Sequence, residues 1–217
     1  RQVLNGLLLE QDNGQVKMVG TDGHRLAIIR RGLGDGSKGE KLSHLIPKKA
    51  LVEVMKLIED EETTFSFSAK NNHLAFMQGD QVIVSRKIDG KFPNYQQVIP
   101  SDNKLQVKIN RGMFQQALKR VSLLADEKSK MVRFDIQSGN IVLTTDTTEL
   151  GEAREEIAIS YSGEDVSVGL NAKYVLDVLS VIDEEEVVLN LKDEKSSCLI
   201  TSNGDKDYQS IVMPMRL

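Results

Sequence analysis

Apolar and polar residues alternate along the chain with two different periods, one typical of helices and one typical of strands. Apolar residues three or four positions apart predict amphipathic helices over 47–58, 111–125 and 171–182. Asn171 suits an N-cap and Pro47 suits the start of the equivalent helix. Strict alternation predicts short strands before and after these helices. The predicted strands are 15–19, 25–30, 63–68, 81–87, 106–109, 132–137, 140–144, 155–160 and 186–191.

The same pattern occurs twice in the chain. Thr21-Asp22 returns as Thr145-Asp146, a shift of 124 residues, and at this shift 46–58 aligns with 170–182. We therefore predict two copies of one α+β domain, over 1–100 and 101–217, joined by a polar, turn-rich stretch. The predicted helix over 111–125 has no counterpart in the first copy. The first domain is thus expected to lack one strand and one helix, and the chain is expected to be a fragment.

Charge is divided unevenly between the predicted helices and the rest of the chain. The formal net charge is -4, yet the three helices hold seven cations and two acids, a net of +5, which leaves -9 elsewhere. A solvated lysine face explains any one helix, but three positive helices together fit the backbone of duplex DNA. Tryptophan is absent, so base stacking on single strands is disfavoured. The cations predicted to face DNA are Lys48, Lys49, Lys56, Arg111, Lys119, Arg120 and Lys173.

Other residue types exclude several kinds of site. The single cysteine, Cys198, rules out an internal disulfide and fits a reducing compartment. It stands opposite Leu74 of the first copy, which favours a buried apolar thiol over a nucleophile. The three histidines lack metal-ligand spacing, and no apolar stretch is long enough to span a bilayer. We expect no metal, no cofactor, no membrane partner and a cytoplasmic location.

The segment 21–27, Thr-Asp-Gly-His-Arg-Leu-Ala, is the most distinctive motif. Both copies share Thr-Asp, which indicates a structural turn, whereas Gly23-His24-Arg25 stands opposite the unrelated 147–149. A site specific to the first copy is therefore expected at this tripeptide. A hydrolase that uses Asp22, His24 and Arg25 on a small anionic substrate is one alternative, but no G-x-S-x-G or similar nucleophile context accompanies them.

Two further features of the second copy indicate a binding surface. Tyr174 replaces Ala50 on the equivalent helix, as a variation in packing or as one wall of a site. The C-terminal segment 211–217 is apolar to its last residue, although chain ends usually fray. We expect it to border a groove, for which methionine is well suited because it adapts to varied partners.

Four segments together resemble the family of bacterial beta sliding clamps, the processivity subunits of DNA polymerase III. They are 21–27, 91–95, 174–179 and 213–217. The resemblance implies most of a middle clamp domain and a whole C-terminal one, with antiparallel sheets outside and helices on the inner face of a ring. It implies a non-catalytic subunit of a DNA-directed DNA polymerase, a nucleotidyltransferase, that slides on duplex DNA.

The resemblance also implies partners and a site. The full-length clamp is a homodimeric ring; this fragment would be monomeric, since it lacks the domain that faces Leu123 and Leu124 of a neighbour. The DNA polymerase III alpha subunit, the clamp loader, other polymerases and mismatch-repair proteins would dock short Gln-Leu-x-Leu-Phe peptides in a pocket between the two domains. Gln97, Ser129 and Lys195 differ from some members, which leaves peptide preference at the rim open. The implied pocket residues are Leu4, Thr21, Gly23, His24, Arg25, Leu26, Pro93, Val98, Asn171, Tyr174, Ile211, Val212, Met213, Pro214, Met215, Arg216 and Leu217.

One more alternative follows from the duplication alone. A duplicated scaffold that binds proteins but never DNA would have the same repeat and the same apolar C-terminus.

Overall fold

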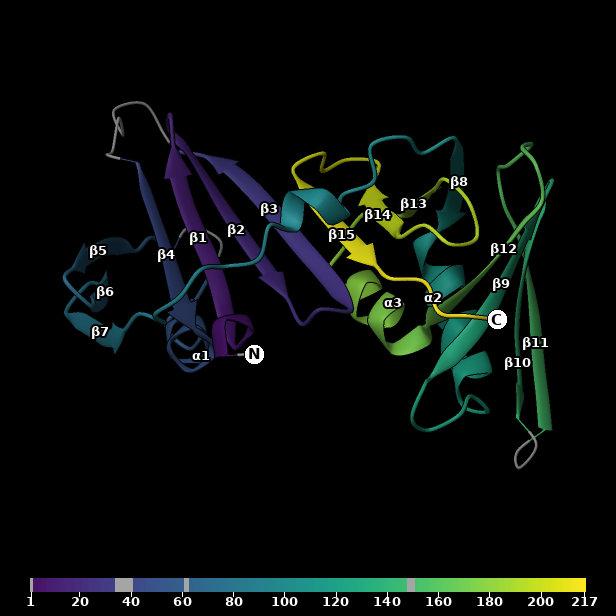
Figure 1. Cartoon of the computed structure of the whole chain (residues 1–217), viewed down its shortest axis with the longest axis horizontal. Helices are drawn as coiled ribbons and strands as arrows, with labels where there is room; N and C mark the ends of the chain where they lie inside the picture. The colour runs from purple at the N-terminus through teal and green to yellow at the C-terminus, as the bar shows by residue number, and fades with distance from the viewer. Residues whose placement is uncertain (1, 34–40, 61–62, 148–150) are drawn as a thin grey trace. The chain divides into compact units, whose positions relative to one another are not determined.

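The chain folds into two compact units, and the order of strands and helix in the first unit recurs in the second. The computed structural model describes residues 2–33, 41–60, 63–147 and 151–217. The first unit comprises Arg1–Gly23 and Ile28–Asn94, and the second comprises His24–Ala27 and Tyr95–Leu217 (Figure 1). Residues 148–149, part of the segment aligned with Gly23-His24-Arg25, lie outside the described residues.

The first unit contains two antiparallel sheets and one helix. Its sheets have the strand orders β4-β1-β2-β3 and β5-β6-β7. Leu8 of β1 lies opposite Val19 of β2 and Leu45 of β4, which brings apolar side chains together. The elements are η1 (Gln2–Leu4), β1 (Gly6–Asp12), β2 (Gln15–Thr21), β3 (Arg25–Gly32), β4 (Leu42–Pro47), α1 (Lys48–Met55), β5 (Ser66–Lys70), β6 (His73–Gln78) and β7 (Gln81–Arg86).

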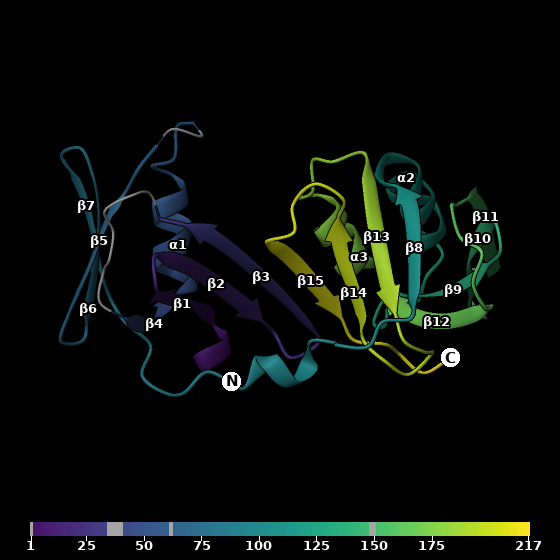
Figure 2. The same ribbon diagram turned by 90° about the horizontal axis from the view of Figure 1, so that it is seen from above.

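The second unit adds one strand and one helix to this order. Its sheets have the orders β11-β10-β9-β12 and β15-β14-β13-β8 (Figure 2). The elements are η2 (Tyr95–Val98), β8 (Leu105–Asn110), α2 (Arg111–Ser122), β9 (Met131–Gln137), β10 (Asn140–Thr147), β11 (Gly151–Ala158), β12 (Val166–Asn171), α3 (Ala172–Leu179), β13 (Glu186–Leu191), β14 (Cys198–Ser202) and β15 (Tyr208–Val212).

The core of the second unit lies where its two helices meet its sheets. Helix α2 packs on α3 and on strands of both sheets. Phe114 of α2 and Phe134 of β9 are fully buried, with ring centroids 6.1 Å apart. Phe134 also lies opposite Leu143 and Val168 on the neighbouring strands, so one apolar row crosses the sheet beneath the helix. This burial holds α2 and α3 in place on the sheets.

The predicted α+β fold class is confirmed, as are all three helices. Each helix ends about three residues earlier than its apolar period predicts. Beyond α1, the Lys56 and Leu57 N–H groups donate to carbonyls three residues back instead of four, so the α-helical hydrogen-bond pattern stops there. The strand predicted at 155–160 occupies 151–158, and that at 63–68 occupies 66–70. Six strands were not predicted: β1, β4, β6, β12, β14 and β15.

No helix in the described part of the chain has both the length and the apolar character needed to cross a bilayer.

Candidate functional site

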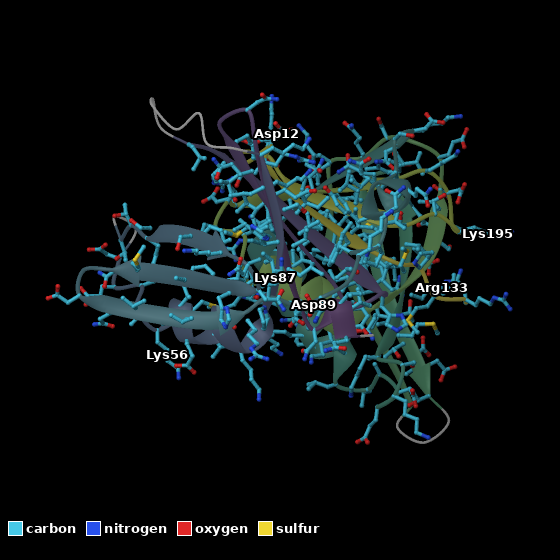
Figure 3. The ribbon with its side chains drawn as sticks, turned by 60° about the vertical axis from the view of Figure 1, so that its left-hand side comes forward. Asp12, Lys56, Lys87, Asp89, Arg133 and Lys195 are labelled. Carbon is cyan, nitrogen blue, oxygen red and sulfur yellow. The ribbon has the colours of Figure 1, made fainter. Side chains whose placement is uncertain are left out.

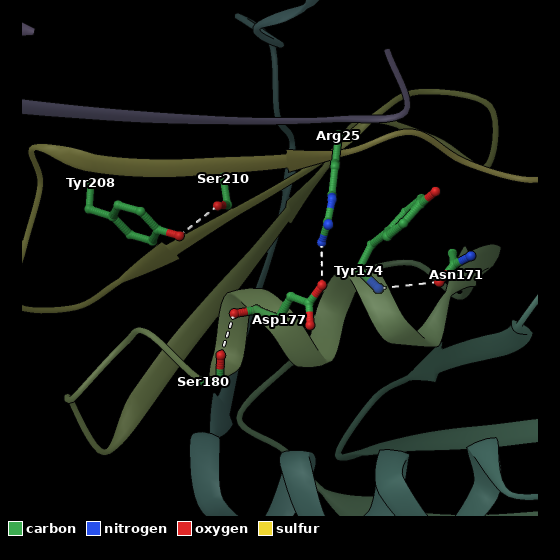
Figure 4. A network of polar contacts seen from close by, with 7 residues as sticks. All are labelled: Arg25, Asn171, Tyr174, Asp177, Ser180, Tyr208 and Ser210. Atoms are coloured by element: carbon green, nitrogen blue, oxygen red, sulfur yellow. Dashed lines mark hydrogen bonds and ion pairs between the residues drawn. The ribbon is translucent and has the colours of Figure 1, made fainter. Parts of the chain in front are cut away.

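The start of helix α3 is fixed by one asparagine. The Asn171 side-chain oxygen accepts a hydrogen bond from the Tyr174 backbone N–H at 3.2 Å, as an N-cap does (Figure 4). The Asn171 amide nitrogen donates to the Ser129 carbonyl at 2.8 Å. One side chain therefore joins the first turn of α3 to the segment before β9 and sets the position of Tyr174.

The Tyr174 ring lies against two residues of the distinctive motif. The His24 ring stacks on it with centroids 6.4 Å apart and an interplanar angle of 23°. The Arg25 guanidinium carbon lies 4.5 Å from the Tyr174 ring centroid, within cation–π range. Arg25 also donates from Nη1 to an Asp177 carboxylate oxygen at 2.5 Å (Figure 4). The side chains of His24, Arg25, Tyr174 and Asp177 thus form one continuous surface, called the wall below.

The C-terminal segment is docked beside this wall. The Met213 N–H donates to the His24 carbonyl at 3.0 Å, and the Met215 N–H donates to the Gly169 carbonyl at 2.8 Å. A Cβ atom at Gly169 would lie 2.9 Å from the Met215 oxygen and 3.0 Å from Leu217 Cδ2. A side chain at this position would push the C-terminal segment away, so the close approach requires glycine.

Two clefts include the last residue of the chain in their lining. One, of about 710 Å³, is lined by Glu194, Lys195 and the segment from Pro214 to Leu217. The other, of about 490 Å³, includes Ser129, Met131 and Leu217 in its lining. Leu217 borders both clefts and is 56% exposed. An apolar side chain from another molecule can therefore contact Leu217.

The second unit brings together the predicted residues His24, Arg25, Asn171, Tyr174 and those of the C-terminal segment. Leu26, Ile211 and Val212 are buried, so they support the surface rather than form it. Val98 is half-buried, and its carbonyl accepts a hydrogen bond from Ser197 Oγ at 3.3 Å.

The other four predicted pocket residues, Leu4, Thr21, Gly23 and Pro93, belong to the first unit. There the Gly23 N–H donates to Thr21 Oγ1 at 3.1 Å, so the shared threonine takes part in holding the turn of the motif. Leu4 is half-buried and Pro93 is exposed.

The predicted DNA-facing cations differ in how they are engaged. Arg120 makes a two-point ion pair with Glu155, at 2.6 and 3.1 Å, and this contact lowers the pKa of the Glu155 carboxyl. Arg111 donates to the Glu184 carbonyl at 2.9 Å. Lys56, labelled in Figure 3, is the C-cap residue of α1 and pairs with Glu53, and both side chains are exposed. Of the seven predicted cations, Lys48, Lys49, Lys119 and Lys173 are exposed and make no ion pair with the described residues.

The cysteine, the acidic residues and Arg25 bear on the catalytic alternatives. Cys198 is fully buried, as predicted, and burial raises the pKa of its thiol to about 12, so the nucleophilic thiolate is not formed near neutral pH. No group of three or more His, Cys, Asp or Glu side chains in this part of the chain could hold a metal ion. The hydrolase alternative is not supported, since Arg25 is engaged by Asp177 and Tyr174.

Sequence models of known families match both halves of the chain. The model of the DNA polymerase III beta subunit, C-terminal domain, matches residues 96–216. The model of the central domain of the same subunit matches residues 1–94. The beta sliding clamp of Pseudomonas putida is 34% identical over 217 residues, which cover all of this chain and 59% of that protein. The Escherichia coli clamp is 31% identical over 217 residues, which again cover all of this chain and 59% of that protein.

Solved structures give the same result. The DNA polymerase III subunit beta of Pseudomonas aeruginosa matches with a TM-score of 0.95 and 33% identity, over all of this chain and 60% of that one. A sliding clamp of the same organism bound to griselimycin matches with a TM-score of 0.94 and 32% identity, over 99% and 58% of the two chains. The chain thus spans about three fifths of the length of these relatives. The predicted resemblance is confirmed, and this chain belongs to the family of the DNA polymerase III beta subunits, the bacterial sliding clamps.

Proposed function

We propose that this chain is the central and C-terminal part of a non-catalytic processivity clamp that encircles duplex DNA and recruits proteins through short peptides. Family membership supports the general role, and one relative is bound to griselimycin, so a ligand site exists within the family. The observation that carries the recruiting role is the C-terminal segment docked beside the His24–Tyr174 pair.

The wall has the chemistry that an apolar peptide anchor requires. The Tyr174 ring and the methionine side chains offer apolar contact area, while His24 and Arg25 supply polar groups at its margin. A few such contacts carry most of the binding energy in a protein interface. Met213 and Met215 are half-buried, so they can adapt to different anchors without leaving their own backbone contacts.

A titration with a fluorescently labelled Gln-Leu-x-Leu-Phe peptide tests the recruiting role. Removal of 213–217 is expected to weaken binding by at least about 1–2 kcal/mol, the scale of a hot spot. Tyr174→Ala, which leaves the C-terminal backbone in place, is expected to do the same. Leu123→Ala removes a side chain that is 77% exposed and is the matched control, expected to leave affinity unchanged. Equal affinity for all four proteins would overturn the pocket assignment.

The DNA contact is proposed to be weak, mobile and independent of sequence. The exposed lysines Lys48, Lys49, Lys119 and Lys173 can neutralise phosphates and release counterions, whereas Arg111 and Arg120 are engaged within the second unit. In a ring of the full-length protein loaded on circular DNA, Lys119→Glu with Lys173→Glu is expected to reduce the salt-sensitive contact. A scaffold that binds only proteins would show no salt-sensitive DNA contact at all.

The ring itself is proposed to need contacts that this chain makes with a neighbour through Leu123. That side chain lies at the C-terminal end of α2 and is 77% exposed. The 217-residue chain alone is expected to sediment as a monomer, and a stable closed dimer in analytical ultracentrifugation would contradict this.

A further inference from the structure

We propose that Asp177 is a positioning residue for peptide binding: its carboxylate holds the Arg25 guanidinium over the Tyr174 ring, so that the wall is formed before a peptide arrives. This inference rests on the proposed recruiting function and adds to it a residue outside the implied pocket. Asp177 need not touch the peptide to act in this way.

The geometry provides for this role. Tyr174 and Asp177 are three residues apart on α3, so their side chains project from neighbouring positions on one helix face. The Arg25 guanidinium contacts both, with Nη1 at 2.5 Å from the carboxylate and its carbon 4.5 Å from the ring centroid (Figure 4). A planar guanidinium can present an N–H edge to a carboxylate and a flat face to an aromatic ring at the same time. The Arg25 side chain therefore contacts the Asp177 carboxylate and the Tyr174 ring at the same time.

Stabilisation of the fold does not account for the contact. The Arg25 and Asp177 side chains are 33% and 47% exposed, and ion pairs of that exposure contribute little to folding. The effect expected is on conformational freedom, because an arginine has many rotamers and the carboxylate favours those that cover Tyr174. A surface ordered in advance loses less entropy when a ligand binds.

The first unit shows what the same helix does without this arrangement. At the shift of 124 residues Glu53 stands in place of Asp177, and it pairs with Lys56, the C-cap residue of its own helix, at 2.8 Å. Ala50 stands in place of Tyr174, so no ring is present to be covered. A carboxylate at this helix position thus takes different partners in the two copies, and only in the second does it hold a cation on an aromatic ring.

A double-mutant cycle on the 217-residue chain, with the labelled Gln-Leu-x-Leu-Phe peptide, tests the proposal. Asp177→Asn is expected to weaken peptide binding about threefold to tenfold, the scale of a cation–π contact. In an Arg25→Gln background the same change is expected to have an effect of less than about 1.5-fold, because Asp177 then has no guanidinium to hold. Asp183→Asn, an exposed acid beyond α3, removes the same charge and is the control, expected to leave affinity unchanged.

A spectroscopic readout separates this proposal from the proposed function. In the free chain, Asp177→Asn is expected to shift the Arg25 side-chain N–H signal and the Tyr174 ring signals, while Asp183→Asn leaves both in place. If the wild-type chain binds no peptide, the recruiting function fails and the free-chain spectra alone decide the positioning role. Unmoved Arg25 and Tyr174 signals, or an Asp177→Asn effect that persists in the Arg25→Gln background, would overturn the inference.

Discussion

Helices α1 and α3 hold the same place in the two units but differ in burial. Met55 of α1 is 68% exposed, whereas its equivalent in α3, Leu179, is fully buried. In the second unit α2 packs on α3, and the described part of the first unit contains no helix in the corresponding place. The same apolar period can therefore be core in one copy and surface in the other, because burial depends on the neighbouring element.

The two helices also begin differently. Helix α3 is capped by the Asn171 side chain, whereas Pro47 at the start of α1 makes no side-chain cap. Tyr174 and Asp177 of α3 contact Arg25 of the distinctive motif, and the Asn171 cap sets the position of Tyr174. The two helices thus share a structural frame, but α3 carries an aromatic ring in contact with His24 and Arg25 where α1 carries Ala50.

Removal of the equivalent apolar side chains tests the difference in burial most strongly. Leu179→Ala is expected to reduce the free energy of unfolding by about 2–5 kcal/mol, the cost of a cavity in a packed core. Met55→Ala is expected to change it by no more than about 0.5 kcal/mol, as for a surface position. Urea denaturation followed by circular dichroism measures both. Equal losses for the two variants would mean that α1 is as well covered as α3.

Gly169→Ala is expected to destabilise the second unit by about 1–3 kcal/mol through overpacking against the C-terminal segment. The first copy has Leu45 at this position, so the equivalent strand does not require glycine there. Gly20→Ala is the control, because a Cβ there meets no atom within 4 Å. Urea denaturation and hydrogen exchange at the Met215 amide measure the effect, and protection of that amide equal to wild type would refute the close approach.

Loss of the cap is expected to have a smaller effect. Asn171→Ala removes the hydrogen bonds to the Tyr174 N–H and the Ser129 carbonyl and should cost about 1 kcal/mol. Pro47→Ala should change stability less, since Pro47 makes no side-chain cap. Faster hydrogen exchange at the Tyr174 amide in Asn171→Ala would be the direct sign; an unchanged rate would show that the cap is not needed.

Acid stability is expected to change least. The Arg120 guanidinium lowers the pKa of Glu155 through its hydrogen bonds. A lowered carboxyl pKa adds stability above the ordinary value of 4.5, and this is lost as the pH falls through the folded-state pKa. Glu155→Gln should therefore make the fall in melting temperature between pH 7 and pH 3 shallower, whereas Asp183→Asn should not. Parallel curves for Glu155→Gln and wild type would contradict this.

Much of the fold could be predicted because each predicted helix carries a complete apolar stripe. Strand β14 was missed because its residues, Cys198–Ser202, are buried on both faces, so no alternation marks it. Strand β12, Val166–Asn171, does alternate, with apolar residues at 166, 168 and 170, so its pattern was a usable signal. The true helix ends could not be predicted either, since the apolar stripe continues past the last hydrogen-bonded turn.

The site could be predicted where the two copies differ in residue type. Tyr174 against Ala50 and the Gly23-His24-Arg25 tripeptide are such differences, and the structure brings Tyr174 beside His24 and Arg25. Gly169 and Asp177 were missed, although Leu45 at the position matching Gly169 was a usable signal. Asp177 gave no signal because its counterpart, Glu53, is also an acid.

A titration of the 15N-labelled chain with a Gln-Leu-x-Leu-Phe peptide tests the central claim, that the α3 side of the second unit is the binding surface. The amide signals expected to move most are those of His24, Tyr174 and the segment 213–217, while those of α1 remain in place. Larger shifts on α1 than on α3, or no shifts at millimolar peptide, would contradict the account.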